Sequence, residues 1–386
     1  MPGISLRGLW VSVALLAVSH GAEATPLPWG QDSDMVAWEE FAQVTAAAGN
    51  PRIKKVAFET WASDQDIYVA ASPQWPAVSA PKVLQHSGLA TAHLRTGIHP
   101  FAFVPGACTT PQGLPSGDNA AAGSGFPNTG CIGEEVRRNW ASFQYIVSNE
   151  LYSKAGLARA FASGLKVDLP ADAIEFKGDW ASVADAANWL AKGDQNAIRT
   201  HYYTSFSQIN NVNTEIALLS FHISSKQIKD WVWADFEGSM NLGRCDVIGC
   251  HDSFGAVTAD VTPNQTVYQS YGDCPKTPTL IKMLQGAGTD PIWQNYCLKG
   301  SQVTFADDKN VPTKLGNSVI EPLNAGVFID KSSCITCHAY ASFDKSGTLN
   351  GFAIDDPTKS PIGAVDPAQM KGFASNDFIW GIIFAH

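Results

Sequence analysis

The five residues Cys334-Ile335-Thr336-Cys337-His338 constrain this chain more than any other feature of its sequence. A C-x-x-C-H run is the attachment signature of c-type haem. In that chemistry the two thiols add across the two vinyl groups of the porphyrin, and the histidine that follows ligates the iron from its proximal side. The run therefore predicts one covalent haem c, attached through Cys334 and Cys337 with His338 as the proximal ligand.

Three other uses of a C-x-x-C run remain open but fit the surrounding sequence less well. A zinc site needs a second pair of ligands at finger or ribbon spacing, and the nearest other cysteine, Cys297, has no close partner. A thioredoxin-type redox motif follows a strand in a βαβ unit, whereas this run follows Ser332 and Ser333, which are typical of a helix N-cap. The third alternative is a structural disulfide beside an unrelated histidine.

The N-terminus points independently to an exported protein. Arg7 precedes a short apolar run at residues 9–18, and residues 22–24 (A-E-A) have the form of a signal-peptide cleavage site. The run is too short to span a bilayer, and no later stretch reaches that length. We therefore expect cleavage after Ala24, a periplasmic location, which suits covalent haem attachment, and no membrane-spanning segment.

Six cysteines lie outside the motif, and in an oxidising compartment an even set should form disulfides. The sequence leaves their connectivity open. Proximity along the chain favours three local pairs: Cys108 with Cys131, Cys245 with Cys250, and Cys274 with Cys297.

The charge balance restricts the partners. The formal net charge is −10, which argues against nucleic acid and against an anionic membrane surface. An acidic surface instead favours a basic redox partner protein, although it also serves solubility alone.

The hydrophobic pattern predicts an α+β fold in three parts. These are a signal peptide (1–24), a disulfide-stapled α+β region with antiparallel strands and helices (25–300), and a mainly helical cytochrome c-like haem segment (301–386). Helices are expected over 31–49 and 133–164, and strands over 53–61, 173–180, 200–206, 215–223 and 230–236. A Gly- and Pro-rich loop is expected over 106–130, a haem helix from Ser332 or Ser333 to about Ala341, and a helix or strand over 376–384.

The block Asn317 to Ala341 resembles the haem segment of bacterial exported monohaem cytochrome c-like proteins, in which a long Trp-rich region precedes one C-terminal C-x-x-C-H. Shorter similarities lie at residues 58–61, 174–177, 221–223 and 231–237. The resemblance implies covalent haem, export and electron transfer, and it transfers no reaction. The related pattern has a histidine where this chain has Gly238, which puts any shared role at that position in doubt.

The second axial ligand decides the chemistry of a c-type haem. A methionine or histidine there gives an electron carrier, whereas an open position allows peroxide, O₂ or substrate chemistry. Met370 is the first candidate, because it follows His338 in a Gly- and Pro-bearing stretch that resembles a ligand loop. The weaker candidates are Met35, Met240, Met283, His222, His251 and His386.

The first functional hypothesis is a periplasmic monohaem cytochrome that carries single electrons. The alternative is a haem c enzyme, peroxidase-like or oxidase/dehydrogenase-like, with a substrate pocket in the long N-terminal region. A third possibility is that this region is a docking or scaffold module. Catalytic residues stay unknown at this stage: Asp235 and Glu237 could act as acid–base groups, but a solvent-exposed sheet edge is the favoured interpretation.

Overall fold

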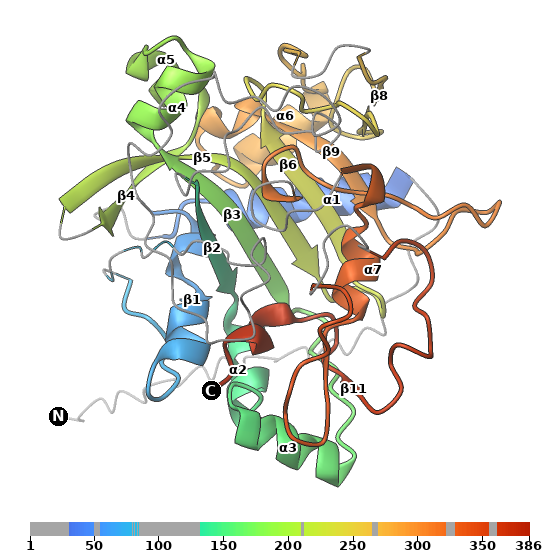
Figure 1. Ribbon diagram of the computed structural model, residues 1–386. Coiled ribbons are helices and arrows are strands. Elements are labelled where there is room, and N and C mark those ends of the chain that lie inside the picture. The colour runs from blue at the N-terminus through green and yellow to red at the C-terminus, as the bar shows by residue number, and fades with distance from the viewer. Residues whose placement is uncertain are drawn as a thin grey trace, which may run out of the picture.

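The computed structural model describes residues 31–49, 55–78, 80, 82, 84, 132–209, 212–264, 269–321, 329–354 and 361–386 (Figure 1). Three predictions lie outside these residues: the signal peptide, the loop over 106–130 and the pair Cys108–Cys131.

A seven-stranded antiparallel sheet forms the centre of the described structure (Figure 1). The strand order is β1-β2-β3-β5-β6-β9, and β4 pairs with β5. The bounds are β1 Ala62–Ser63, β2 Ile132–Arg138, β3 Ile174–Ser182, β4 Thr204–Ile209, β5 Val212–Ser225, β6 Val232–Gly238 and β9 Tyr296–Gln302. The strands predicted over 173–180, 215–223 and 230–236 are confirmed, whereas the one predicted over 200–206 begins later, at Thr204.

Two short strand pairs lie outside this sheet, β7 Cys250–His251 with β8 Asp260–Val261 and β10 Ser342–Phe343 with β11 Ala374–Ser375. The structure pairs Cys245 with Cys250 and Cys274 with Cys297, as predicted.

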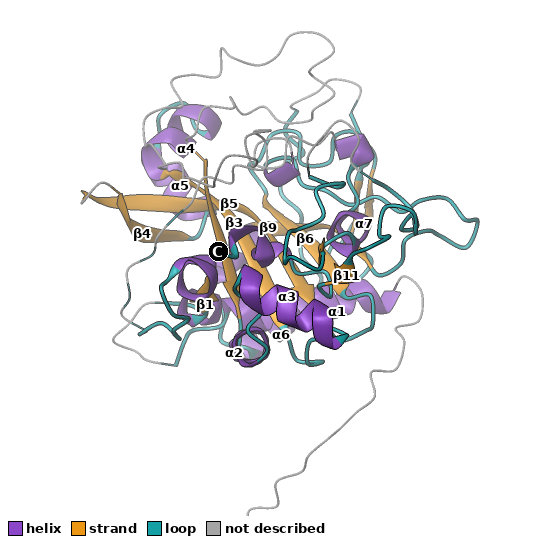
Figure 2. Ribbon diagram, turned by 60° about the horizontal axis from the view of Figure 1, so that its bottom comes forward, coloured by secondary structure: helices purple, strands orange, loops and turns teal. Residues whose placement is uncertain are grey.

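Helices surround the sheet on its ends and faces (Figure 2). The α-helices are α1 Gln31–Thr45, α2 Trp140–Ser148, α3 Lys154–Ser163, α4 Val183–Leu190, α5 Gln195–His201, α6 Pro278–Gly286 and α7 Cys334–Ala339. Shorter turns are 3-10 helices at Ala57–Thr60, Pro291–Asn295, Ile329–Lys331 and Trp380–Phe384, and a π-helix at Gln65–Val69. Several of the α-helices begin with a polar N-cap residue. In α3, for example, the Ser153 side chain accepts a hydrogen bond from the Gly156 amide.

One face of the sheet is apolar and packs on α1, which lies behind the strands in Figure 1. Trp38 and Phe41 of α1 meet Phe236 of β6 with ring centroids 5.0 and 4.8 Å apart, and all three side chains are fully buried. Burial of such aromatic side chains removes large apolar areas from water, so this face holds most of the hydrophobic core.

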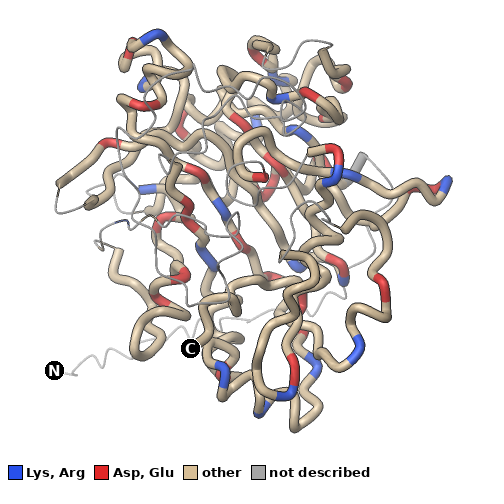
Figure 3. Tube along the Cα trace, viewed as in Figure 1, with Lys and Arg blue, Asp and Glu red and all other residues tan. Residues whose placement is uncertain are grey.

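The opposite face of the same strands is charged. Because side chains alternate along a strand, the neighbours of the core phenylalanines point the other way. Figure 3 shows acidic and basic residues following one another along the central strands. The C-terminal segment with α7 lies over this face (Figure 1). There the ring centroid of His338 is 4.5 Å from that of Trp233.

The helix predicted over 133–164 begins too early, because residues 132–138 form β2 instead. Charged side chains there suggest the exposed side of a helix, but they are buried as ion pairs with the next strand: Glu134 with Lys177 at 2.9 Å and Arg138 with Glu175 at 2.6 Å. The strand predicted over 53–61 is also wrong over Ala57–Thr60, which form a 3-10 turn.

The prediction of a mainly helical cytochrome c-like segment over 301–386 is wrong. The described part of this segment holds the six-residue α7, two 3-10 turns and short strands, joined by loops. The stretch predicted as a closing helix or strand over 376–384 is a 3-10 turn from Trp380, preceded by Asp377 and Phe378 with left-handed φ angles of 48° and 69°. Packing on the sheet replaces the helix–helix contacts of a separate bundle. The division at residue 300 stays a prediction, and β9 runs across it.

Candidate functional site

In space, the start of helix α7 lies beside the end of strand β9, and the Gln302 side chain connects the two. The Gln302 amide oxygen accepts from the Ile335 amide at 3.0 Å, and its nitrogen donates to the Ser333 hydroxyl at 2.9 Å. This side chain takes the place of a serine cap, since Ser333 makes no side-chain cap hydrogen bond. The predicted start of the helix is therefore confirmed, and it is fixed to the sheet.

The two thiols of α7 are free, whereas the four other described cysteines pair. Burial raises the pKa of the Cys334 thiol well above its ordinary value, with Glu321 adding to the effect, and burial raises the pKa of Cys337 to about 12. Reactive redox cysteines have lowered pKa values, so this environment does not favour thiol exchange.

His338 presents one nitrogen and binds the protein with the other. Its Nδ1 lies 2.7 Å from the Phe378 carbonyl oxygen, which can only accept, so Nδ1 carries the hydrogen. Nε2 then keeps its lone pair for a ligand, the usual arrangement of a metal-binding imidazole held by a backbone carbonyl. Burial lowers the pKa of His338 to about 3, which keeps the ring neutral.

A buried polar group lies against Cys334. The ligand atoms of His222, Glu321 and Cys334 all lie within 4.8 Å of one another. His222 comes from the middle of β5, and Glu321 from the segment after β9. Together, His222, Asp235 and Glu321 form a cluster that we call the acid–base triad.

His222 stands between two carboxylates. Its Nε2 is 3.4 Å from Asp235 Oδ2 and 3.5 Å from Glu321 Oε1. Both separations exceed an ordinary hydrogen bond, and His222 Nε2 and Asp235 Oδ2 are buried without a hydrogen-bond partner. Burial alone would lower the pKa of His222, but Asp235 and then Glu321 outweigh it and raise the pKa to about 9.

Lys177 and Asp235 flank His222 in the sheet register, one on each neighbouring strand. Burial would lower the pKa of Lys177, but its ion pair with Glu134 raises it, so this side chain stays charged. Burial, and then Glu134, raise the pKa of Asp179 well above its ordinary value. The charged face thus holds a lysine that stays charged and a carboxyl group with a raised pKa. Perturbed groups of this kind are common where acid–base chemistry takes place.

The segment before Glu321 is fastened to this face. The Asn317 side chain donates to Asp235 Oδ1 at 2.8 Å, and the Ser318 amide donates to Glu237 Oε1 at 2.9 Å. Lys299 of β9 lies 3.5 Å from the same Glu237 oxygen. These contacts hold Glu321 beside His222.

Met370 lies near the motif. It is half-buried and packs in a small apolar cluster with Cys337, Tyr340 and Trp380. Its sulfur is 3.7 Å from the Ser342 hydroxyl and 3.7 Å from the Asn350 amide nitrogen, both weak contacts.

Among the weaker candidates for the second axial ligand, His222 lies beside the motif, and the others make contacts elsewhere in the fold. Met240 and Met283 pack against the apolar core, and Met35 belongs to α1. His251 contacts Asp260 at 2.7 Å, and His386 contacts the Tyr68 carbonyl at 2.8 Å. Of the candidate histidines, the structure brings His222 to Cys334.

The interpretation of Asp235 and Glu237 as a solvent-exposed edge is wrong, because both side chains are 0% exposed in a strand paired on both sides. Sequence analysis missed Lys177 and Glu321. A signal for Lys177 existed, since charged residues alternate with core residues along Ile174–Ser182.

Gly238 has a steric explanation here. A Cβ at this position would lie 2.2 Å from Tyr202 Cε1, within the side of β6 that packs on the core. A histidine at 238 would therefore point away from Cys334 in this chain.

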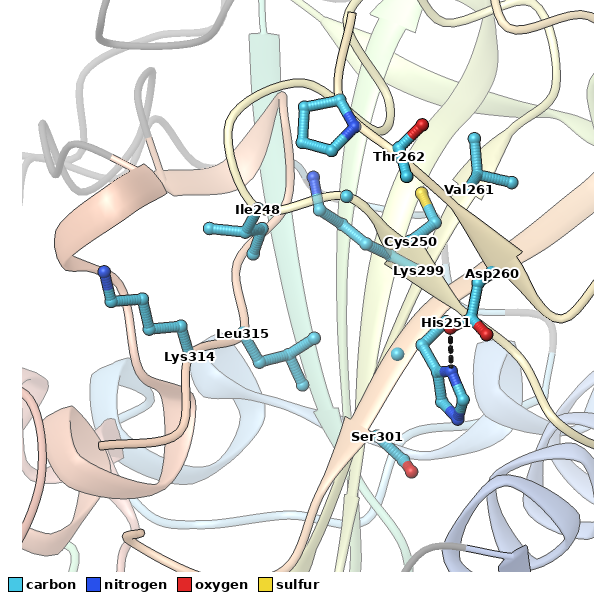
Figure 4. A pocket seen from close by; sticks show the side chains of 13 residues that line it. Ile248, Cys250, His251, Asp260, Val261, Thr262, Lys299, Ser301, Lys314 and Leu315 are labelled. Carbon is cyan, nitrogen blue, oxygen red and sulfur yellow. Dashed lines mark hydrogen bonds and ion pairs between the residues drawn. The ribbon is translucent and has the colours of Figure 1, made fainter. Parts of the chain in front are cut away.

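A cavity of about 320 Å³ lies next to the site, between β7–β8 and β9 (Figure 4). His251 and Asp260 line it from one side and Leu315 from the other. The Leu315 carbonyl also accepts from the Cys334 thiol at 3.5 Å, so Leu315 separates the cavity from the motif.

Comparison of the chain with protein-family models, with curated proteins and with solved structures gave no match. Within the described residues, no helix is both long and apolar enough to cross a membrane.

Proposed function

We propose that this chain is a periplasmic c-type haem protein that carries single electrons, with one haem on Cys334 and Cys337 and His338 as the proximal ligand. The observation that carries the proposal is the state of these three side chains. Two free thiols stand one turn apart, beside an imidazole whose Nδ1 is already bound to the Phe378 carbonyl. A bound haem c would supply a one-electron iron couple.

The residues around the motif suit such a group. Trp233 packs beside the His338 ring, and Trp380 donates to the Cys337 carbonyl at 3.2 Å, so the ligand and the attachment helix are held from two sides. Pre-organised ligands limit the rearrangement that accompanies a change of charge, which favours electron transfer.

Met370 is our proposed second axial ligand. It shares an apolar cluster with Cys337, and its sulfur has only two weak polar contacts to lose. A Met370→Ala variant should convert a six-coordinate spectrum into one that responds to carbon monoxide, while Met283→Ala, in the apolar core, should not. An unchanged Met370→Ala spectrum would remove this assignment.

Export is also part of the proposal. The disulfides Cys245–Cys250 and Cys274–Cys297 support an oxidising compartment, in agreement with the signal-like N-terminus. The net charge of −10 favours a basic redox partner and disfavours nucleic acid.

A haem enzyme is the second candidate, and one observation favours it. A simple carrier is served by an apolar shell, whereas here the acid–base triad reaches Cys334. Buried acid–base groups beside a cofactor are common in active sites. In such an enzyme the triad would exchange protons with a small substrate.

Absorption spectra of the purified protein, oxidised and reduced, with and without carbon monoxide, test both candidates. Low-spin haem c bands that ignore carbon monoxide would support the carrier. A high-spin spectrum that shifts with carbon monoxide would favour the enzyme. Periplasmic preparations without covalent haem would overturn the proposal itself.

A further inference from the structure

We infer that Glu321, held by His222 and Asp235, takes up a proton when the site gains an electron, so that electron transfer by this protein is coupled to proton transfer. This inference rests on the proposed function, because it places the acid–base triad beside a haem attached at Cys334.

The acid–base triad lies close to the sulfur at which the haem would be attached. The Glu321 carboxylate, the His222 ring and the Cys334 sulfur lie within 4.8 Å of one another. A thioether bond would form at that sulfur, so the attached group would begin there. An electron added to it lowers the local charge by one, and in a buried site such a change acts strongly on neighbouring carboxyl groups.

Hydrogen bonding within the triad is unmet. His222 Nε2 and Asp235 Oδ2 are buried without hydrogen-bond partners, and Nε2 stands 3.5 Å from Glu321 Oε1. Glu321 Oε2 accepts from the Asn317 amide, which leaves Oε1 as the oxygen that faces the histidine. Oε1 is therefore the oxygen at which this carboxyl can take up a proton, because Oε2 is held by a backbone donor.

The pKa of Glu321 depends on its electrostatic surroundings. Burial raises the pKa of this carboxyl, His222 opposes the rise, and Asp235 adds to it. A negative charge added nearby would raise the pKa of this carboxyl further and so favour its protonated form. The other charged and titratable groups around the triad are Lys177 and Asp179 on β3, Glu134 on β2, Glu237 on β6, Lys299 on β9, and Cys334 and His338 on α7.

Water has access to part of the triad. The Glu321 side chain is 10% exposed and that of His222 is 13% exposed, whereas Asp235 is fully buried. Part of the Glu321 side chain therefore reaches solvent, from which a proton can come, whereas His222 Nε2 is itself buried. On reduction, one electron would pass from a one-electron donor protein to the iron of the bound haem, and one proton from bulk solvent would add to Glu321 Oε1. Reoxidation returns both.

The experiment is a redox titration of the haem-loaded protein from about pH 5 to pH 9. The wild-type midpoint potential should fall as pH rises, approaching about 59 mV for each tenfold fall in proton concentration. Glu321→Gln should flatten this slope. The matched control is Glu215→Gln, the same substitution at a partly exposed ion pair with Arg199 elsewhere on β5, which should keep the slope.

A wild-type potential that does not depend on pH, or a slope that survives in Glu321→Gln, would overturn the inference. In either case reversible one-electron chemistry would still stand, so the proposed function would be untouched. His222→Gln gives a separate check: loss of an axial ligand in its spectrum would make His222 an iron ligand and would also overturn the inference.

Reduced-minus-oxidised infrared spectra of the wild type need no variant. Reduction should increase the absorption of a protonated carboxyl group in water and shift it in deuterium oxide. Absence of that band would overturn the assignment of Glu321, even if the variants failed to fold.

Discussion

The two faces of the central sheet are built from the same strands, yet along β5 and β6 one is lined by aromatic side chains and the other by charged ones. On β6, Phe236 enters an aromatic cluster with Trp38 and Phe41, while the adjacent Asp235 faces His222 and the segment that carries Cys334. Along β5 and β6 the first face excludes water by packing, although at β2 it also buries the ion pairs of Glu135 with Lys82 and Arg137. The other buries charge, which is costly unless each charge is paired.

We attribute stability mainly to the apolar face and the candidate site to the charged face. Replacing buried ion pairs by apolar side chains is often neutral or stabilising, so a row of charges beneath α7 is poorly explained by stability alone. The apolar face supplies the rigidity, and the charged face uses it to hold Asp235, His222 and Lys177 in register.

The largest expected effect is the loss of covalent haem from the segment that lies over the charged face. A Cys334→Ser/Cys337→Ser double variant should lose all covalent haem, because both attachment atoms are gone. Haem staining after denaturing electrophoresis measures this. The control is Cys245→Ser/Cys250→Ser, which removes a disulfide but should keep the stain. Covalent haem on the first variant would place the attachment site elsewhere.

Next comes the apolar face. Phe236→Ala should lower the free energy of unfolding by about 3–5 kcal/mol, because it leaves a cavity in the aromatic cluster. Urea unfolding measures it, and the haem spectrum should stay unchanged. Asp235→Asn, one residue away on the other face, should cost less. A larger loss from Asp235→Asn would mean that the charged face carries the fold.

The third prediction concerns pH. The folded pKa of His222, about 9, exceeds its ordinary value of 6.5, so the folded state binds this proton more tightly. The resulting stability is fully present below about pH 6.5 and is lost as pH rises towards 9, by up to roughly 3 kcal/mol. Unfolding free energies of the oxidised protein across this range should fall less steeply in His222→Gln.

His251→Gln is the control for that series, because the His251 side chain is 52% exposed and contacts Asp260 outside the triad. Its profile should match the wild type. Equal slopes in His222→Gln and in the wild type would show that His222 does not gain its charge from the triad.

The smallest effect is expected at Gly238. Gly238→Ala should cost about 1–3 kcal/mol, because its Cβ would overlap the Tyr202 ring on the apolar side. The redox potential should not change. Gly286→Ala, at the end of α6 with nothing within 4 Å of its Cβ, should be neutral or slightly stabilising. A changed potential in Gly238→Ala would connect this position to the charged face.

Local patterns predicted the parts of the fold that depend on local preference. The alternation in 230–236 correctly predicted a strand, and the helical spacing of 31–49 correctly predicted a helix. In each element the apolar residues recur with the period of the backbone, because only one side of it faces the core. The helix predicted from 133 failed since Glu134 and Arg138 satisfy their charges on a neighbouring strand. Pairing partners distant in sequence are invisible to a local pattern.

The sequence by itself determined the short-range chemistry of this protein: two thiols and an imidazole at fixed spacing in Cys334–His338. It also favoured the local disulfides Cys245–Cys250 and Cys274–Cys297, which the structure then selected. Only the tertiary structure decided what surrounds that motif. His222, Asp235 and Glu321 lie far apart along the chain, and they meet because antiparallel pairing sets two strands in register and a loop covers them. Proximity of this kind arises from the packing of the whole sheet, so no spacing of letters in the sequence records it.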